Sequence, residues 1–165
     1  MTTLIKPDHK AIANYHQRLN EARASKDSQH EGNIRHAFAN LLESTAKAKD
    51  WRLVQELSVR VQGRTIRYDG VLRDSYNLPH GYWEAKDSSD NLDVEIRNKR
   101  DKNYSFKNII FEDTQEAVLF QGGYEVIRAD VDDPDGLADL LSRFYTHEIA
   151  PFRDFDAAIA HFQEE

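Results

Sequence analysis

Hydrophobic and polar residues alternate with two different periods along this chain. In two early stretches, from about residue 7 to 25 and from about residue 29 to 49, apolar residues recur at the three- and four-residue spacing of an amphipathic helix. The apolar positions are Ile12, Tyr15 and Leu19, and then Ile34, Phe38, Leu41, Leu42 and Ala46. A polar segment, 25–28, separates the stretches, so the pattern predicts two helices at the start of the chain.

The period then changes to two, which is typical of β-strands. The residues predicted to share one face are Leu53, Gln55, Leu57, Val59 and Val61. Gln62-Gly63 is a turn sequence, and we expect 64–72 to return as an antiparallel strand. After a polar loop, 74–81, the apolar and aromatic segment around Glu84 predicts a third strand.

The second half of the chain alternates between helical and extended patterns. Residues 87–91 form a polar cap before a charged helix of about 92–102. The segment 104–113 is ambiguous between a strand and the approach to a helix. The remaining predictions are a helix at 114–121 that Gly122-Gly123 ends, a strand at 124–129, a helix at 133–145 and an amphipathic helix at 150–165.

This order of elements predicts an α/β fold. We expect a three-layer sandwich in which helices flank a central mixed β-sheet. Residues 1–149 would form one domain with an N-terminal helical extension. The helix at 150–165 either packs on that domain or begins a linker into a larger protein.

Composition narrows the functional classes. Of the 165 residues, 39% are hydrophobic and 31% charged, which indicates a globular chain with a real core. The absence of a bilayer-length apolar run, of a signal sequence and of cysteine favours a cytoplasmic protein without disulfides or thiolate metal sites. The net charge of −7 argues against strong DNA binding by the chain alone. It does not exclude a nuclease domain that other parts of a protein hold on DNA.

Candidate chemistry lies on two of the predicted strands. Asp69 is on the second strand, and Glu84 and Lys86 share one face of the third, because side chains alternate along a strand. Unpaired buried charge is costly, and a divalent metal shared by Asp69 and Glu84 would explain it. The Ala85 carbonyl could add a ligand, and Lys86 would orient an attacking water or stabilise developing charge. The alternative is a chance ion pair in a highly charged chain.

These residues resemble the motif of the PD-(D/E)XK nuclease superfamily, which has a restriction-endonuclease-like fold. Asp69 would be the first acid and Glu84-Ala85-Lys86 the second half, with Tyr68 where the superfamily usually has proline. From about His30 onward, the chain is similar to the N-terminal nuclease domain of type ISP restriction-modification enzymes. The segments that carry this similarity are 83–88, 108–114 and Gln121.

The resemblance implies a Mg²⁺-dependent DNA endonuclease, in which Mn²⁺ can substitute for Mg²⁺. It implies double-stranded DNA as the substrate, and translocase, methyltransferase and target-recognition domains on the same full-length enzyme, with an ATP-driven motor. Glu31 either resembles the helical acid that such nucleases place near the metal or is an acid favoured by a helix N-terminus. Gln115 either resembles the glutamine that Mrr-like nucleases place beside the site or is an exposed helical residue.

Other functions remain open at this point. One is a stand-alone Mrr-like or resolvase-like nuclease. Another, from a different class, is a catalytically silent DNA-binding or docking module that retains the fold. The basic residues at 99–102, with Lys107, either contact the DNA backbone or form a solvated helix face.

Overall fold

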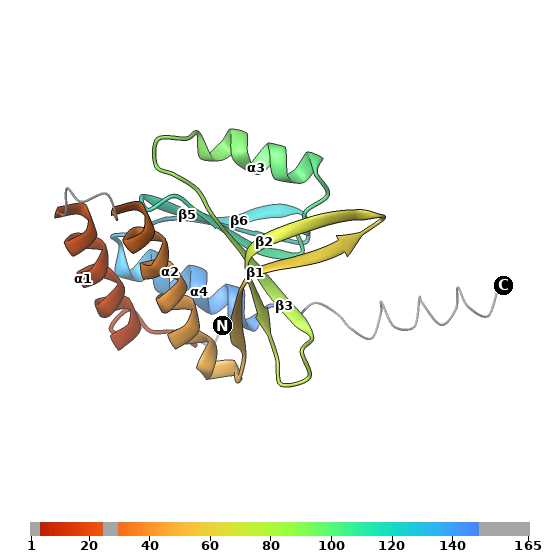
Figure 1. Cartoon of the computed structure of the whole chain (residues 1–165). Helices are drawn as coiled ribbons and strands as arrows, with labels where there is room; N and C mark the ends of the chain where they lie inside the picture. The colour runs from red at the N-terminus through yellow and green to blue at the C-terminus, as the bar shows by residue number, and fades with distance from the viewer. Residues whose placement is uncertain (1–3, 25–29, 149–165) are drawn as a thin grey trace.

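The computed structural model describes residues 4–24 and 30–148, and the side chains of 30–35 are outside this description. The described elements alternate between helices and strands, as Figure 1 shows. In chain order they are α1 (Lys10–Ala24), α2 (His30–Ala46), the 3₁₀ helix η1 (Lys47–Lys49), β1 (Arg52–Val61), β2 (Arg64–Arg73), β3 (Pro79–Ala85), α3 (Leu92–Asp101), β4 (Asn108–Glu112), β5 (Glu116–Gln121), β6 (Tyr124–Asp130) and α4 (Pro134–Thr146). The helix predicted at 150–165 lies outside the described residues.

The strands form one mixed sheet in sequence order, β1-β2-β3-β4-β5-β6. All neighbouring strands are antiparallel except β3 and β4, which are parallel and joined through α3. A parallel pair needs a crossover connection, and α3 is that connection. The α/β architecture with a central mixed sheet is therefore confirmed.

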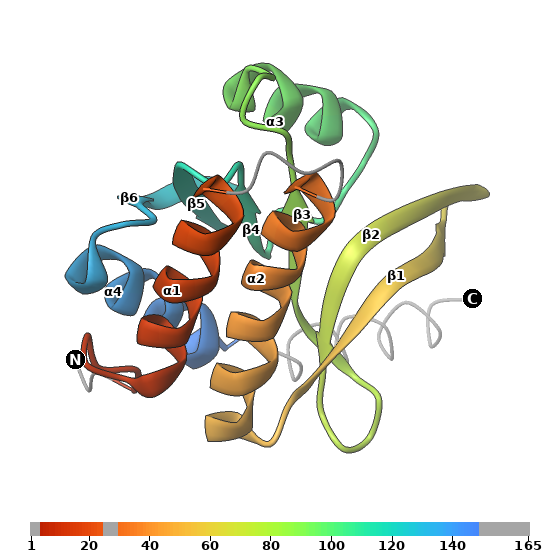
Figure 2. The ribbon, with the colours of Figure 1, turned by 60° about the vertical axis from the view of Figure 1, so that its left-hand side comes forward.

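Two hydrophobic cores lie on opposite faces of this sheet. The larger core joins α1, α2 and α4 to one face, and the predicted helical positions Tyr15, Phe38 and Leu42 are fully buried in it. The smaller core joins α3 to the other face through Leu92 and Ile96. Figures 1 and 2 show α3 alone on its side and α1 and α2 side by side on the other. The predicted three layers are confirmed.

The predicted helix at 114–121 is wrong, because Glu116–Gln121 is strand β5. Gly122 and Gly123 both have positive φ angles, +60° and +89°. Two successive positive φ values are the geometry of a tight hairpin turn, and this turn joins β5 to β6. The ambiguous segment before it is β4 at 108–112. Within the described residues, no helix is long and apolar enough to cross a bilayer.

The predicted single apolar face of β1 is also wrong. Leu53 packs in the larger core, whereas Leu57, Val59 and Val61 pack in the smaller core on the other side of the sheet. The change occurs at Glu56, whose φ of +54° interrupts the regular alternation of side chains. The β1–β2 hairpin thus begins in the sheet and reaches beyond it as a curved arm, as Figures 1 and 2 show.

Candidate functional site

The candidate site lies where the ladder between β2 and β3 ends. The last backbone pair places Gly70 opposite Trp83, so Asp69 and Glu84 would form the next pair. Their side chains replace the ladder there: Ala85 N–H donates to Asp69 Oδ2 at 2.8 Å, and Asp69 N–H donates to Glu84 Oε2 at 3.3 Å. The structure therefore brings the two predicted carboxylates together through reciprocal contacts with each other's strands.

Gly70 sets how closely β1, β2 and β3 approach beside the carboxylates. A Cβ atom at this position would lie 2.6 Å from Leu53 Cδ1 and 2.8 Å from Trp83 Cε3. At such distances a neighbouring side chain must shift, so a larger residue at position 70 would displace Leu53 or the Trp83 ring. Trp83 and Ala85 pack in the larger core, whereas Glu84 and Lys86 meet α3 on the opposite face. The predicted alternation along β3 is confirmed.

Glu84 is a buried acid with a second carboxyl group, that of Asp69, beside it. Its residue is 2% exposed, and its Oε1 atom accepts no hydrogen bond from the described residues. Burial raises the pKa of Glu84 to about 8, with the neighbouring Asp69 carboxyl adding to the shift and Lys99 and Lys86 opposing it. Two neighbouring buried or half-buried carboxyl groups disfavour simultaneous ionisation unless a cation joins them.

Helix α3 supplies two charged residues that the sequence analysis missed as site residues. Lys99 Nζ lies 3.6 Å from Glu84 Oε1, and Glu95 Oε2 lies 3.6 Å from Lys86 Nζ. The solvated position predicted as one alternative for Lys99 is wrong, because its side chain is 15% exposed and lies 3.6 Å from Glu84, whereas its contact with DNA stays a prediction. The signal was present: Lys99 follows Leu92 and Ile96 at the spacing of the buried stripe of α3.

The donor set suits a hard divalent cation such as Mg²⁺. Two carboxylates and a backbone carbonyl are oxygen ligands, and Mg²⁺ commonly binds one or two carboxylates while retaining waters. Ala85 directs its N–H toward Asp69, and the carbonyl of a strand residue points to the same side as its N–H. The described residues contain no group of three acidic or histidine side chains arranged for a metal. Ala85 would therefore complete the set.

The two supporting residues predicted from the sequence have different outcomes. Glu31 is in the first turn of α2, but its side chain lies outside the described residues. Gln115 is not on a helix: it lies in the β4–β5 turn, where its N–H donates to Asp113 Oδ1 at 3.0 Å. Among the described residues, no hydrogen bond or ion pair joins Gln115 to Asp69, Glu84 or Lys86. Its catalytic role stays a prediction.

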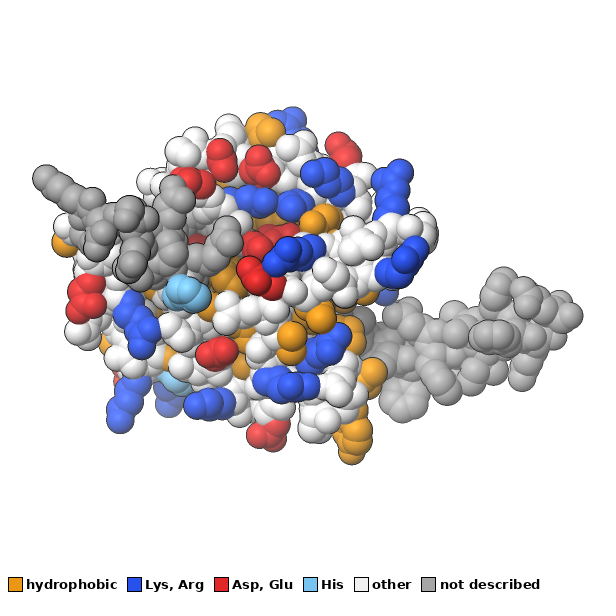
Figure 3. All heavy atoms as spheres, viewed as in Figure 1, with side chains coloured by type: hydrophobic (Ala, Val, Ile, Leu, Met, Phe, Trp, Pro, Cys, Tyr) orange, Lys and Arg blue, Asp and Glu red, His pale blue; other side chains and the backbone are white. Residues whose placement is uncertain are grey.

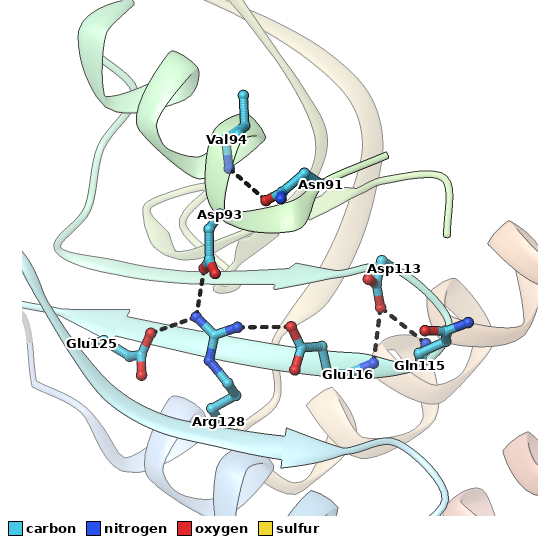
Figure 4. A network of polar contacts seen from close by, with 8 residues as sticks. All are labelled: Asn91, Asp93, Val94, Asp113, Gln115, Glu116, Glu125 and Arg128. Carbon is cyan, nitrogen blue, oxygen red and sulfur yellow. Dashed lines mark hydrogen bonds and ion pairs between the residues drawn. The ribbon is translucent and has the colours of Figure 1, made fainter. Parts of the chain in front are cut away.

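A second charged cluster, around Arg128, joins α3 to strands β5 and β6. Arg128 of β6 contacts Asp93 of α3 at 2.7 Å, Glu116 of β5 at 2.7 Å and Glu125 at 2.8 Å, as Figure 4 shows. The helix begins beside this cluster, where Asn91 Oδ1 accepts a hydrogen bond from Val94 N–H at 3.1 Å. The same helix thus reaches Arg128 at its first turn and Glu84 one to two turns later.

Comparison with known proteins is informative at the level of structure. No protein-family model and no curated protein matches the chain. A chain in the cryo-EM structure of a DrdV–DNA complex is 39% identical in sequence, with a TM-score of 0.82 over 94% of this chain. This chain spans 16% of that chain's length. Together with the mixed sheet and its flanking helices, this match shows that the chain has the predicted restriction-endonuclease-like fold.

Proposed function

We propose that this chain is a Mg²⁺-dependent endonuclease module that hydrolyses DNA phosphodiester bonds. The observation that carries the proposal is the interlocked pair of Asp69 on β2 and Glu84 on β3, whose contacts of 2.8 and 3.3 Å join the two strands just before Lys86, which follows β3. The PD-(D/E)XK resemblance predicts this arrangement on this fold. The match to a chain solved with DNA supports the substrate class.

Each residue has a defined task in this proposal. Asp69, Glu84 and the Ala85 carbonyl would hold the metal, and Mn²⁺ would substitute for Mg²⁺. The bound ion would supply an activated water and charge stabilisation at the phosphate. Lys86 orients that water or stabilises the developing charge, and Glu95, 3.6 Å from its Nζ, holds the lysine in place. Helix α3 limits water access, since the Lys86 side chain is 16% exposed.

The arm formed by β1 and β2 would carry the DNA backbone to this site. Its outer part has three exposed arginines, Arg60, Arg64 and Arg67, and one acid, Glu56, which pairs with Arg67 at 3.2 Å. Figure 3 shows Lys and Arg side chains over α3 and this hairpin, with Asp and Glu side chains among those over α3 and at the centre of the face, so the basic excess lies on the arm. In a chain with a net charge of −7, such a local basic surface is suited to phosphates.

The spacing along the arm agrees with that role. Arg67 is two residues from Asp69 on β2, and Arg60 pairs with Thr65, two residues further out. Two strand residues rise by about 7 Å, close to two phosphate steps along the axis of one DNA strand. A DNA strand that follows the arm would therefore bring a phosphodiester to the carboxylates.

The proposal extends to a larger enzyme. Because this chain spans 16% of the length of the DrdV chain, we infer that it acts as one module beside other domains. The type ISP resemblance predicts those domains as a translocase, a methyltransferase and a target-recognition domain. In that setting, an ATP-driven motor would deliver the nuclease to DNA, which agrees with the acidic charge of the module itself.

A plasmid-nicking assay tests the catalytic proposal. The protein, its Lys86→Ala variant and a Lys10→Ala control are incubated with supercoiled plasmid in Mg²⁺ or in EDTA. Lys10 is an exposed lysine at the start of α1, on the opposite face from α3. We expect nicking that requires Mg²⁺, persists in Lys10→Ala and disappears in Lys86→Ala. Nicking that persists in EDTA or in Lys86→Ala would contradict the assigned site.

DNA binding without cleavage separates the nuclease from a silent binding module. In EDTA, replacing Arg60 and Arg64 by glutamine should lower the slope of log affinity against log salt by about 0.9 for each phosphate that the protein no longer neutralises. The control is Arg18→Gln, which changes an exposed arginine on α1. A silent module would show this binding effect but no nicking, even in the full-length enzyme with ATP. A stand-alone nuclease would nick without ATP.

A further inference from the structure

Four charged side chains of the site form crossed pairs between a strand and a helix. Glu84 lies on β3 and Lys86 directly follows that strand, two residues later, while Glu95 and Lys99 are four residues apart on α3, so each couple shares a face. The contacts join Glu84 to Lys99 and Lys86 to Glu95, both at 3.6 Å. The lysine nearest Glu84 in space is therefore the helical one, not the one in the strand motif.

Lys99 is held in this position by more than the ion pair. Its Nζ donates a hydrogen bond to Tyr104 Oη at 3.2 Å and lies 4.5 Å from the centre of that ring. Tyr104 Oη in turn donates to the Arg67 carbonyl at 3.0 Å, two residues before Asp69. The ammonium group is thus fixed between an aromatic ring and a carboxylate, and it is shielded from solvent.

We propose that Lys99 is the resident cation of the metal-free site, which balances the charge of Glu84 when this carboxylate is ionised, until a divalent metal takes over that task. This inference rests on the proposed metal site. Glu84 Oε1 accepts no hydrogen bond from the described residues, and the ammonium lies at 3.6 Å, so the oxygen remains available to a stronger cation. The existing contacts with the Tyr104 ring and hydroxyl would still hold Lys99 when the metal binds Glu84.

In this role, Lys99 affects the stability of the metal-free protein and the affinity for Mg²⁺ in opposite directions. A fixed ammonium next to a metal ligand stabilises the empty site and repels an incoming cation. Removing its charge should therefore weaken the metal-free protein and strengthen metal binding at the same time. If Lys99 only supported the fold, replacing it would lower both the stability of the metal-free protein and its affinity for Mg²⁺.

The test measures Mg²⁺ binding without DNA, by calorimetry, and thermal unfolding in EDTA and in Mg²⁺, all at a pH above 8, where Glu84 is ionised. For Lys99→Met we expect a dissociation constant for Mg²⁺ that is lower by roughly tenfold. We also expect a lower Tm in EDTA and a larger rise in Tm on adding Mg²⁺ than in the wild type. Lys99→Gln, which keeps a hydrogen-bonding group for Tyr104, serves if Lys99→Met does not fold.

Two control variants separate charge from packing. Lys99→Arg keeps the charge and should bind Mg²⁺ about as the wild type does. Tyr104→Phe removes the hydroxyl but leaves the ammonium, so it should lower Tm without tightening Mg²⁺ binding. Unchanged or weaker Mg²⁺ binding in a folded Lys99→Met or Lys99→Gln protein would overturn the proposal.

The outcome also stands apart from that of the proposed function. If the wild type binds Mg²⁺ but never nicks DNA, the nuclease proposal fails and the Mg²⁺ affinities still decide the role of Lys99. If only the lysine variants bind Mg²⁺, the inference is supported in its strongest form. If neither the wild type nor the variants bind Mg²⁺, the inference and the metal site fall together.

Discussion

Helix α3 takes part in two clusters of acidic and basic side chains, which differ in burial and in the distance between the charges. At Arg128, one guanidinium binds three carboxylates at 2.7 to 2.8 Å near the surface. At Glu84, two lysines approach buried or half-buried carboxylates to only 3.6 Å, and Glu84 Oε1 accepts no hydrogen bond from the described residues. Short contacts near solvent fasten the helix to the sheet. The longer contacts around Glu84 leave its Oε1 atom free of hydrogen bonds from the described residues, and the proposed metal would bind there.

The largest effect should come from neutralising the buried acid. Glu84→Gln removes a proposed metal ligand, so we expect Mg²⁺-dependent nicking to fall by on the order of a hundredfold or more. The same change removes a costly buried charge, so the metal-free protein should become more stable at about pH 8. Plasmid nicking and urea unfolding in EDTA measure the two effects. Loss of activity together with loss of stability would show that Glu84 acts as a structural residue.

The pH dependence of stability sharpens the same contrast. The pKa of Glu84 is raised from 4.5 to about 8, chiefly by burial, so the folded protein binds a proton more tightly than the unfolded chain does. Its contribution to stability is therefore present below about pH 4.5 and is lost as the pH rises to about 8.

We expect this loss to amount to roughly a few kcal/mol of unfolding free energy in the metal-free protein. Denaturant unfolding in EDTA across this pH range measures it, and the difference from Glu84→Gln isolates the single group. Added Mg²⁺ should reduce the loss, because metal binding displaces the proton. Parallel pH profiles for the wild type and Glu84→Gln would refute the assignment.

Breaking the fastening cluster should have a smaller effect. Arg128→Gln leaves Asp93, Glu116 and Glu125 close together without their shared cation, and we expect a loss of about 1 to 2 kcal/mol at low salt. Because these groups are partly exposed, added salt should shrink that loss. Unfolding in urea at two salt concentrations measures both. Arg143→Gln, which removes a simple pair with Asp139 on α4, is the matched control.

The smallest expected effect is that of detaching α3 from Arg128 alone. Asp93→Asn removes the link between Arg128 and α3 and an acid in the first turn of the helix, at a cost of about 0.5 kcal/mol. Hydrogen exchange should become faster at the amides of α3, while β4 and β5 keep their protection. Equal changes across the sheet would show that α3 is not an independently opening element.

Sequence periodicity predicted most of the fold because the cores follow it. The predicted stripe of α1 and the described part of that of α2 are buried as expected, and Trp83 and Ala85 share the core side of β3. The failure at 116–121 arose from Gly122-Gly123, which suits both a helix end and a hairpin turn. Val118 and Phe120, followed by another strand, favoured the hairpin. The face change at Glu56 had no local signal, because glutamate rarely adopts a positive φ and this one has a φ of +54°.

The sequence predicted those site residues whose role follows from their own strand. It did not predict residues whose role depends on contacts between separate elements. Asp69, Glu84 and Lys86 stood out because acids and a lysine on short apolar strands need a partner. Glu95 and Lys99 were hidden in a helix whose other exposed charges resemble them. Arg128 became informative only when the fold placed α3, β5 and β6 around it.

The positive φ at Glu56 also separates the base of the β1–β2 hairpin, which belongs to the sheet, from the outer arm, whose length can vary. Pairs of residues added or removed at the Gln62-Gly63 turn would change how far the arm extends without turning any side chain near Asp69. A single residue inserted between Glu56 and Leu57 would instead turn the apolar row of the arm toward solvent. Arms of different length can therefore share one unchanged pair of carboxylates at Asp69 and Glu84, provided that the length differs at the tip.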